Sequence, residues 1–377
     1  MEKAEIIISN YHQEEKDEAL VDALKSQNSV LIELALKLKP NLAVGGGALL
    51  NYAVVNADIA LLGELLWMPE ISDNQGIMDE AVRLAVLSER MEWFDVLQRL
   101  VEEGADKDVA LATLFERRAQ KNDRIMWLVE NGASAYIQPM HFERNPNVVE
   151  EIFKAGYGKN IDFSSQGFYM FAINICQNNN ASVVKALVKD RPDFVEQLIK
   201  IAVLDGYPQI VKLLCKEGVI TTIDENLFEK AIYKNHYYVV KHLVEQGVHK
   251  VEYIDVVRAA GYAGTAMLKF FLEEIKKNEP DNPSRKQKTA IYVACVQERK
   301  ENALILLKEG YPCDFDRNIQ VAAVNGSASL IEELMDYATS LNMVSFEEAI
   351  NLAIKNNHIG TVNKMKLLKA KFQAKFQ

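Results

Sequence analysis

The chain has 377 residues, of which 49% are hydrophobic and 25% charged, and a formal net charge of −10. This composition is typical of a soluble protein with a large core, and the acidic balance excludes a general nucleic-acid binder, because phosphate contacts require clustered Lys and Arg. No apolar run approaches the roughly 18 residues that cross a bilayer, and the first residues lack the apolar stretch of a secretory signal, so we expect no membrane span.

Four Cys are scattered without a CxxC pair, which predicts neither a disulfide framework nor a zinc knuckle. We expect no cofactor and no metal. A reducing cytoplasm is the expected location. Delivery into a host cell by a system that ignores N-terminal signals is the alternative.

Apolar residues at i, i+3 and i+4 spacing predict a series of helix pairs. Residues 1–16 are expected to be an N-terminal extension, and residues 17–362 one repeat domain. The predicted pairs cover, in chain order, residues 17–39, 48–68, 77–104, 109–132, 168–193, 195–219 and 224–248, then a pair ending in the run MLKFFLEE, pairs closing at Gly310 and near Leu341, and a last unit starting at Phe346. A polar insertion at residues 276–288 is expected to be a surface loop.

The series is irregular at residues 133–165. There the segment YIQPMHFERNPN carries two Pro where a first helix should be, and Pro interrupts a helix interior. This fifth unit is expected to keep only its second helix, VVEEIFKAG.

Two consecutive units show the repeat most clearly. Residues 195–219 and 224–248 align at an offset of 29 residues. The alignment pairs Ala202 with Ala231, Leu214 with Leu243, and Gly218 with Gly247. Each unit predicts a first helix, a turn at Gly206 or Asn235, and a second helix closed by Gly at a C-cap position. A period of this size indicates a solenoid, in which each unit packs against its neighbours.

The second-helix ending IVKLLCKEG, after a first helix with a small Ala, resembles the ankyrin repeat family. The TPLH opening of that family is absent, and the chain uses 13 residues from Gly218 to Ala231, roughly four fewer than an ankyrin unit of about 33 residues needs. The resemblance implies an all-α, ankyrin-like helical-repeat solenoid of about 11–12 helix-turn-helix units with shortened fingers, in which first helices line a concave face.

Aligning the second helices on their closing Gly predicts burial position by position. Residues seven and four before the Gly are aliphatic or small and are expected in the core: Leu97, Ile125, Val149, Val211, Val240 and Ala303, and Leu100, Leu128, Ile152, Leu214, Leu243 and Leu306. The position five before the Gly, which His242 occupies in one unit, is chemically mixed and is expected to be a half-exposed rim. A small residue recurs in the first helices, where close helix approach explains it: Ala85, Ala202, Ala231, Ala260, Ala294, Ala322 and Ala353.

Two residues before that Ala, none of these units has an aliphatic side chain. The row is Arg83, Lys200, Glu229, Arg258, Tyr292, Gln320 and Asn351. With Tyr233 and Tyr262 half a turn further along, it predicts a surface that binds a partner protein or peptide, or alternatively a merely solvated face. Because exposed charges contribute little to folding, we expect joint replacement of Lys200, Glu229 and Arg258 to weaken a partner with little change in melting temperature.

The irregular region at residues 116–147 is the second candidate site. Charged side chains there replace the apolar residues of other units, beside a missing first helix. The candidates are Arg117, Arg118, His141 and Arg144. They predict a notch for an acidic peptide or phosphate, or an enzyme site with the repeats as its platform. The alternative is a decayed repeat whose long side chains extend to water.

Other signals for chemistry are weak. His236, His242 and His249 occupy a turn, a rim and a loop of one unit and share no helix face, so we expect no metal site. The three Gly at residues 45–47 lack the Lys-Ser/Thr of a phosphate loop and are expected to form a turn between helices. No local Cys-His signature indicates a nucleophile.

The C-terminal tail, residues 363–377, has five Lys and no acidic residue. Its apolar residues Met365, Leu368, Phe372 and Phe376 fall on one helical stripe. It is expected either to cap the last unit or to contact an anionic membrane surface or an acidic partner weakly.

These patterns together predict a non-enzymatic interaction scaffold, expected to be a monomer, that binds a protein or peptide on its first-helix face. An enzyme or acidic-ligand binder with its site at residues 116–147 is the alternative. A free-standing, degenerate array of this kind also fits an effector delivered into a host cell.

Overall fold

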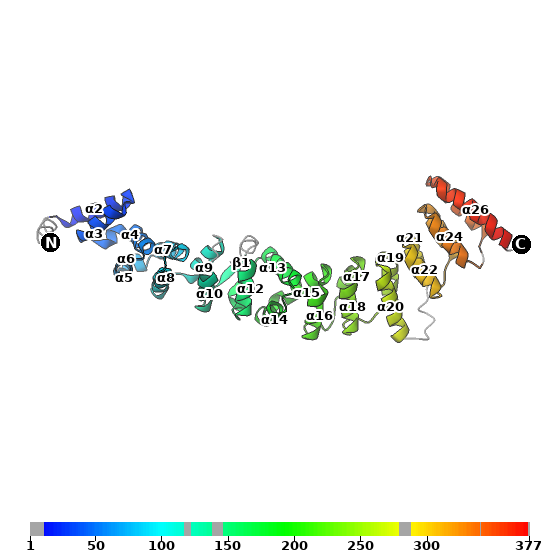
Figure 1. The fold of residues 1–377 in the computed structure, drawn as a ribbon, viewed down its shortest axis with the longest axis horizontal. Helices are drawn as coiled ribbons and strands as arrows, with labels where there is room; N and C mark the ends of the chain where they lie inside the picture. Colours follow the sequence, from blue (N-terminus) through cyan, green and yellow to red (C-terminus); the bar gives the residue numbers. More distant parts are fainter. Residues whose placement is uncertain (1–10, 117–121, 138–145, 279–287, 340, 376–377) are drawn as a thin grey trace. The chain divides into compact units, whose positions relative to one another are not determined.

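The computed structural model describes residues 11–116, 122–137, 146–278, 288–339 and 341–375. Helices make up nearly all of its regular structure (Figure 1), as the spacing of the apolar residues predicts. The chain divides into two units: unit 1, Met1–Ile175 with Ser182–Phe194, and unit 2, Cys176–Ala181 with Val195–Gln377. None of the helices in these described ranges is both long and apolar enough to cross a membrane.

Unit 1 begins with helix pairs close to the predicted positions. Its helices up to the irregular region are α2 (Gln13–Ser26), α3 (Ser29–Lys37), α4 (Leu42–Asn56), α5 (Ile59–Leu66), α6 (Pro69–Ser72), α7 (Gln75–Leu87), α8 (Trp93–Glu102), α9 (Lys107–Glu116) and α10 (Asn122–Glu130). Short polar side chains cap several of their N-termini. Asn28 accepts a hydrogen bond from the backbone N–H of Val30, and Asp58 accepts one from Leu61, both at 3.0 Å.

The three Gly near the start connect two helical segments, as predicted. Both segments belong to α4, and they join across a kink at Gly46, which has a φ of 42°. A left-handed residue breaks the helical geometry locally, and the regular helix continues on both sides of it. The short helix α6, which has Pro69 at its start, was not predicted.

The irregular fifth unit contains a pair of strands that the all-α prediction missed. β1 (Ala135–Ile137) pairs in parallel with β2 (Ile161–Phe163), with Ala135 opposite Ile161. Two helical elements lie between the strands in the sequence. They are α12 (Pro146–Lys154), at the position of the expected second helix, and η1 (Gly158–Asn160). Arg191 holds β2 by donating to the carbonyl of Ile161 and pairing with Asp162 at 3.0 Å.

Unit 1 ends in an aromatic core. The remaining elements in this part of the chain are α13 (Ser165–Gln177), α14 (Ala181–Asp190) and η2 (Pro192–Phe194). Phe163 on β2 stacks on Phe171 at 5.2 Å between ring centroids, and Phe168 stacks on Phe194 at 4.4 Å. These rings supply large apolar area beside the two short strands.

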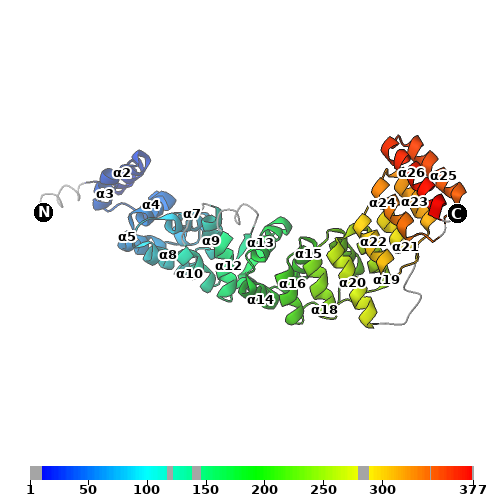
Figure 2. The same ribbon diagram turned by 45° about the vertical axis from the view of Figure 1, so that its right-hand side comes forward.

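Unit 2 is built from helices alone in the residues described. They are α15 (Val195–Leu204), α16 (Pro208–Lys216), α17 (Glu225–Tyr233), α18 (Tyr237–Glu245), α19 (Tyr253–Tyr262), α20 (Thr265–Asn278), α21 (Thr289–Val296), α22 (Lys300–Lys308), α23 (Phe315–Val324), α24 (Ala328–Tyr337), α25 (Met343–Lys355) and α26 (Ile359–Lys375). The odd-numbered helices contact one another in order along the chain, and so do the even-numbered ones (Figure 2). Unit 2 therefore has a first-helix layer and a second-helix layer.

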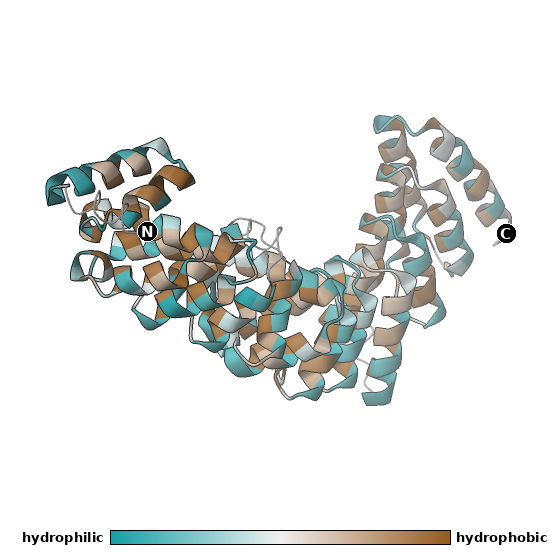
Figure 3. Cartoon of the chain, turned by 60° about the vertical axis from the view of Figure 1, so that its left-hand side comes forward, coloured by the Kyte–Doolittle hydropathy of each residue, from teal (hydrophilic) through white to brown (hydrophobic). Residues whose placement is uncertain are grey.

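The burial pattern derived from the register is confirmed. Every residue assigned to the core at the positions seven and four before the closing Gly is fully buried, and so is every Ala of the first-helix row. Figure 3 shows the corresponding hydrophobic and hydrophilic sides of the helices. The closing glycines have positive φ, for example 71° at both Gly218 and Gly247, as a left-handed C-cap requires.

The turn between the two helices of a unit is fixed by its neighbour. His236 places its Nε2 2.9 Å from the carbonyl oxygen of Leu204, at the end of the preceding first helix. Gly206 has a φ of 80°, and a Cβ there would lie 2.5 Å from the His236 ring. His358 repeats this arrangement with the carbonyl of Val324 at 2.9 Å. Each of these two His thus connects two adjacent helix pairs.

The basic tail packs on its own fold. Its described part, residues 363–375, belongs to α26, which begins at Ile359 and contacts α24 and α25, whereas Phe376 lies outside the described residues. Met365 and Leu368 are buried, as expected for a helix that covers the last pair. Lys364 pairs with Glu332 at 2.7 Å, and Lys369 pairs with Glu347.

Candidate functional site

The first-helix layer of unit 2 carries six of the seven residues in the predicted polar row. Lys200, Glu229, Arg258, Tyr292, Gln320 and Asn351 come from α15, α17, α19, α21, α23 and α25, which are consecutive members of this layer. Arg83 lies apart from them, on α7 of unit 1, where it pairs with Glu80 at 3.4 Å. We call the exposed surface formed by the odd-numbered helices α15, α17, α19, α21, α23 and α25 the first-helix face.

Arg258 is not the exposed charge that the sequence predicted. Its side chain is only 15% exposed. Its guanidinium bonds to Glu229 at 3.0 Å, to Asp255 at 3.2 Å and to Glu225 on the neighbouring helix. Burial alone would lower the pKa of Arg258, but the three carboxylates raise it above its ordinary value. Arg258 therefore ties α17 to α19.

The alignment of the repeats places Arg258 on its helix but does not show which side chains surround it. Asp255 is completely buried and also accepts hydrogen bonds from the backbone N–H of Glu252 and from His249, whose Nε2 lies 2.9 Å away. The His249 ring stacks on Phe228 with 3.7 Å between centroids. A buried carboxylate needs such partners, so His249 has a structural role here. In the sequence, the one indication of this buried carboxylate was an Asp between the apolar Ile254 and Val256 of α19.

Tyr233 and Tyr262 come together as the 29-residue offset predicts. Their rings meet edge to face with 4.7 Å between centroids. They are 44% and 40% exposed. The Tyr233 hydroxyl donates to Glu229, and this bond raises the pKa of Tyr233. The two rings are therefore held in place on adjacent helices while a large part of each stays open to solvent.

The C-terminal part of the first-helix face has a shallow depression. It has a volume of about 380 Å³ and is lined by Gln320, Glu348, Asn351, Leu352 and Lys355. Gln320 donates to Glu348 at 3.2 Å, which joins α23 to α25. Two predicted residues, Gln320 and Asn351, thus line one surface feature.

The remaining row members differ in exposure. Lys200 is exposed and pairs with Glu196 on its own helix at 2.6 Å, so it does not extend the Arg258 network. Tyr292 is half-buried beneath Arg317, whose guanidinium carbon lies 4.0 Å from the ring centroid. Residues at the same position of the row therefore differ in environment: Lys200 is exposed, Tyr292 is covered by an Arg, and Arg258 lies in a network of carboxylates.

Over the described ranges, no group of three or more His, Cys, Asp or Glu could hold a metal ion. The side chain of His242 is 18% exposed, so this position is more covered than the half-exposed rim that the sequence predicted, and burial followed by the nearby Lys212 lowers its pKa. Burial raises the pKa of Cys176 and Cys295 to about 12, which makes these thiols poor nucleophiles at neutral pH.

The second candidate site lies outside the described residues. Arg117, Arg118, His141 and Arg144 all belong to segments that the structure does not describe.

Comparison with known proteins adds no family to this geometry. No protein-family model matches the chain, and no curated protein matches it.

Proposed function

We propose that the chain is an ankyrin-like helical-repeat solenoid that binds a partner protein or peptide through the first-helix face, without catalysis. The observation that carries this proposal is the contrast between positions within the repeat. The core and Ala positions are filled by similar, fully buried residues in every unit compared. The polar row on the first-helix layer holds a different side chain in each unit, which is how repeat proteins acquire an extended recognition surface.

The Tyr233–Tyr262 pair is the best candidate for the centre of this surface. Tyr supplies contact area with few rotatable bonds, and residues of this type dominate binding energy at protein interfaces. The edge-to-face contact and the bond to Glu229 already restrict both rings, so a partner has less side-chain freedom to remove. Polar groups along the row, such as Gln320 and Asn351, can supply hydrogen bonds to an extended segment.

The raised thiol pKa values and the structural use of His236 and His249 favour a binding role over catalysis.

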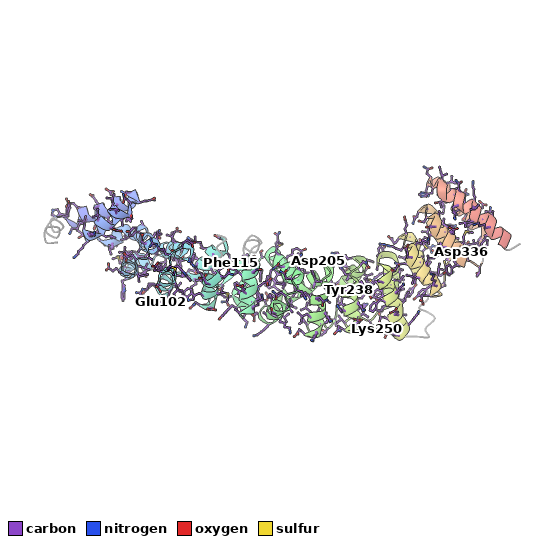
Figure 4. All side chains as sticks on the ribbon, in the orientation of Figure 1. Glu102, Phe115, Asp205, Tyr238, Lys250 and Asp336 are labelled. Carbon is purple, nitrogen blue, oxygen red and sulfur yellow. The ribbon has the colours of Figure 1, made fainter. Side chains whose placement is uncertain are left out.

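A comparative capture experiment tests the proposal. The parent, the variant Tyr233→Ala/Tyr262→Ala and the control Tyr238→Ala are immobilised, and bound proteins are quantified by mass spectrometry. Tyr238 is also an exposed Tyr, at 64%, but it lies on second helix α18 (Figure 4). We expect a protein that the parent and the control retain and that the double variant binds about tenfold or more weakly. Equal retention by all three would contradict the proposed face.

A further inference from the structure

We propose that unit 1 has a second binding surface, formed by Trp93, Phe94 and Trp127, which takes a basic amphipathic helix of a partner protein. We call these three residues the aromatic surface. They lie on second helices α8 and α10, so this inference does not depend on the Tyr pair or on the first-helix face of unit 2.

The three rings form one continuous group. Phe94 contacts Trp93 at 5.5 Å and Trp127 at 5.4 Å between ring centroids, both edge to face. Phe94 is 37% exposed although it is a large apolar side chain. Figure 2 shows α5, α8 and α10 following one another along the same side of unit 1. Phe94 is thus a bridge that links the aromatic side chains of two neighbouring helices.

A buried Arg holds this group from below. Arg124, which is buried, places its guanidinium carbon 4.2 Å from the centroid of the Trp93 ring. It also donates to the carbonyl oxygen of Val86. Because stacking on the buried Arg124 holds Trp93 before any partner binds, the cost of ordering the aromatic surface is reduced.

The exposed charges of the two helices favour a basic partner. The exposed charged side chains of α8 with its N-cap, and of α10, are all acidic: Glu92, Asp95, Glu102, Asp123 and Glu130. The exposed Arg90 precedes this N-cap and bonds to Asn56 at 3.4 Å. The two Arg of these helices do not add an exposed positive charge. Arg124 is buried, and the half-buried Arg99 pairs with Glu103 at 3.1 Å. Aromatic rings on helices whose own exposed charges are acidic complement a helix with one apolar side and flanking Lys or Arg. These acidic charges also repel an anionic membrane.

Tryptophan fluorescence gives a direct readout, because all three Trp of the chain lie in unit 1. Trp67, which is 80% exposed, is replaced by Phe in every sample so that Trp93 and Trp127 are the only reporters. The probe is a Trp-free 14-residue amphipathic peptide of Lys, Leu and Ala, and its counterpart has Glu at each Lys position. We expect a saturable blue shift with the basic peptide only, and about tenfold or more weaker binding by the Phe94→Ala variant.

Two charge variants separate the aromatic surface from general attraction to an acidic protein. One is Asp95→Asn/Glu102→Gln/Glu130→Gln, and its matched control neutralises three exposed acids of unit 2, Glu273→Gln/Glu298→Gln/Glu301→Gln. Both lose the same charge, and both keep every core side chain. We expect the first to weaken the peptide several-fold, with a smaller salt dependence, and the control to bind like the parent.

The proposal is overturned if Phe94→Ala and the parent titrate alike, or if the two charge variants weaken the peptide equally. It is also overturned if sedimentation shows a dimer of the parent that Phe94→Ala dissociates, because the surface would then belong to a second copy. Circular dichroism shows whether Phe94→Ala is folded. If it is not, the two charge variants decide the question.

Discussion

Replacing Arg258 with Ala is expected to lower the free energy of unfolding by about 3 kcal/mol, the low end for breaking a buried ion pair. The variant leaves Asp255 fully buried with only His249 and a backbone N–H as partners. It also leaves Glu225 and Glu229 close together without their shared cation. Urea denaturation followed by circular dichroism measures the effect.

Lys200→Ala is the matched control for Arg258→Ala. Lys200 holds the same register position two units earlier, but it is exposed and bonds only within its own helix in the contacts described. Exposed ion pairs of this kind contribute little, so the expected change is within about 0.5 kcal/mol. Similar losses for the two variants would mean that the Arg258 network does not connect α17 to α19. Because Arg258 is mostly buried in this network, we expect joint replacement of Lys200, Glu229 and Arg258 to lower the melting temperature, unlike the expectation from the sequence, which took Arg258 to be exposed.

Leu214→Ala and Leu243→Ala are each expected to cost about 2–5 kcal/mol. Both Leu are fully buried at the position four before the closing Gly, where a truncation leaves a cavity between layers. His242 gives the comparison. His242→Ala should cost less than about 1 kcal/mol, because its side chain, unlike that of Leu243, keeps 18% exposure, and its contact with Glu245 is a loose one at 3.8 Å. Thermal unfolding of the three variants tests the register, and a loss at His242 as large as that at Leu243 would contradict it.

The register predicted those features of the fold that recur in each unit. A glycine with positive φ, an aliphatic residue at a fixed distance before it, and an Ala between first helices have the same physical cause in every unit, so Gly218, Leu214 and Ala202 predict Gly247, Leu243 and Ala231. The same offset of 29 residues predicted that Tyr233 and Tyr262 lie on adjacent first helices, where their rings are in contact.

Features that occur once were not predictable in this way. The strands at Ala135–Ile137 and Ile161–Phe163 are too short to show a two-residue period. The role of Arg258 depends on the reach of its guanidinium to Glu225 and Asp255, whereas a row of aligned positions only indicates which helix carries it. The contact of Phe94 with Trp127 also joins different positions of adjacent units, so no single column of the alignment contains it.

If the first-helix face of unit 2 binds the partner, a cross-linker on that face should capture the partner directly. A photoreactive benzoylphenylalanine is placed either at Tyr233 or at Tyr238, two exposed Tyr of the same helix pair, and the full chain is irradiated in extract with its partner present. We expect a discrete adduct from position 233, absent from position 238, in which the cross-linked peptide of the partner is the same in repeated experiments. Adducts with that partner from position 238 alone, or equally from both positions, would contradict binding at the first-helix face.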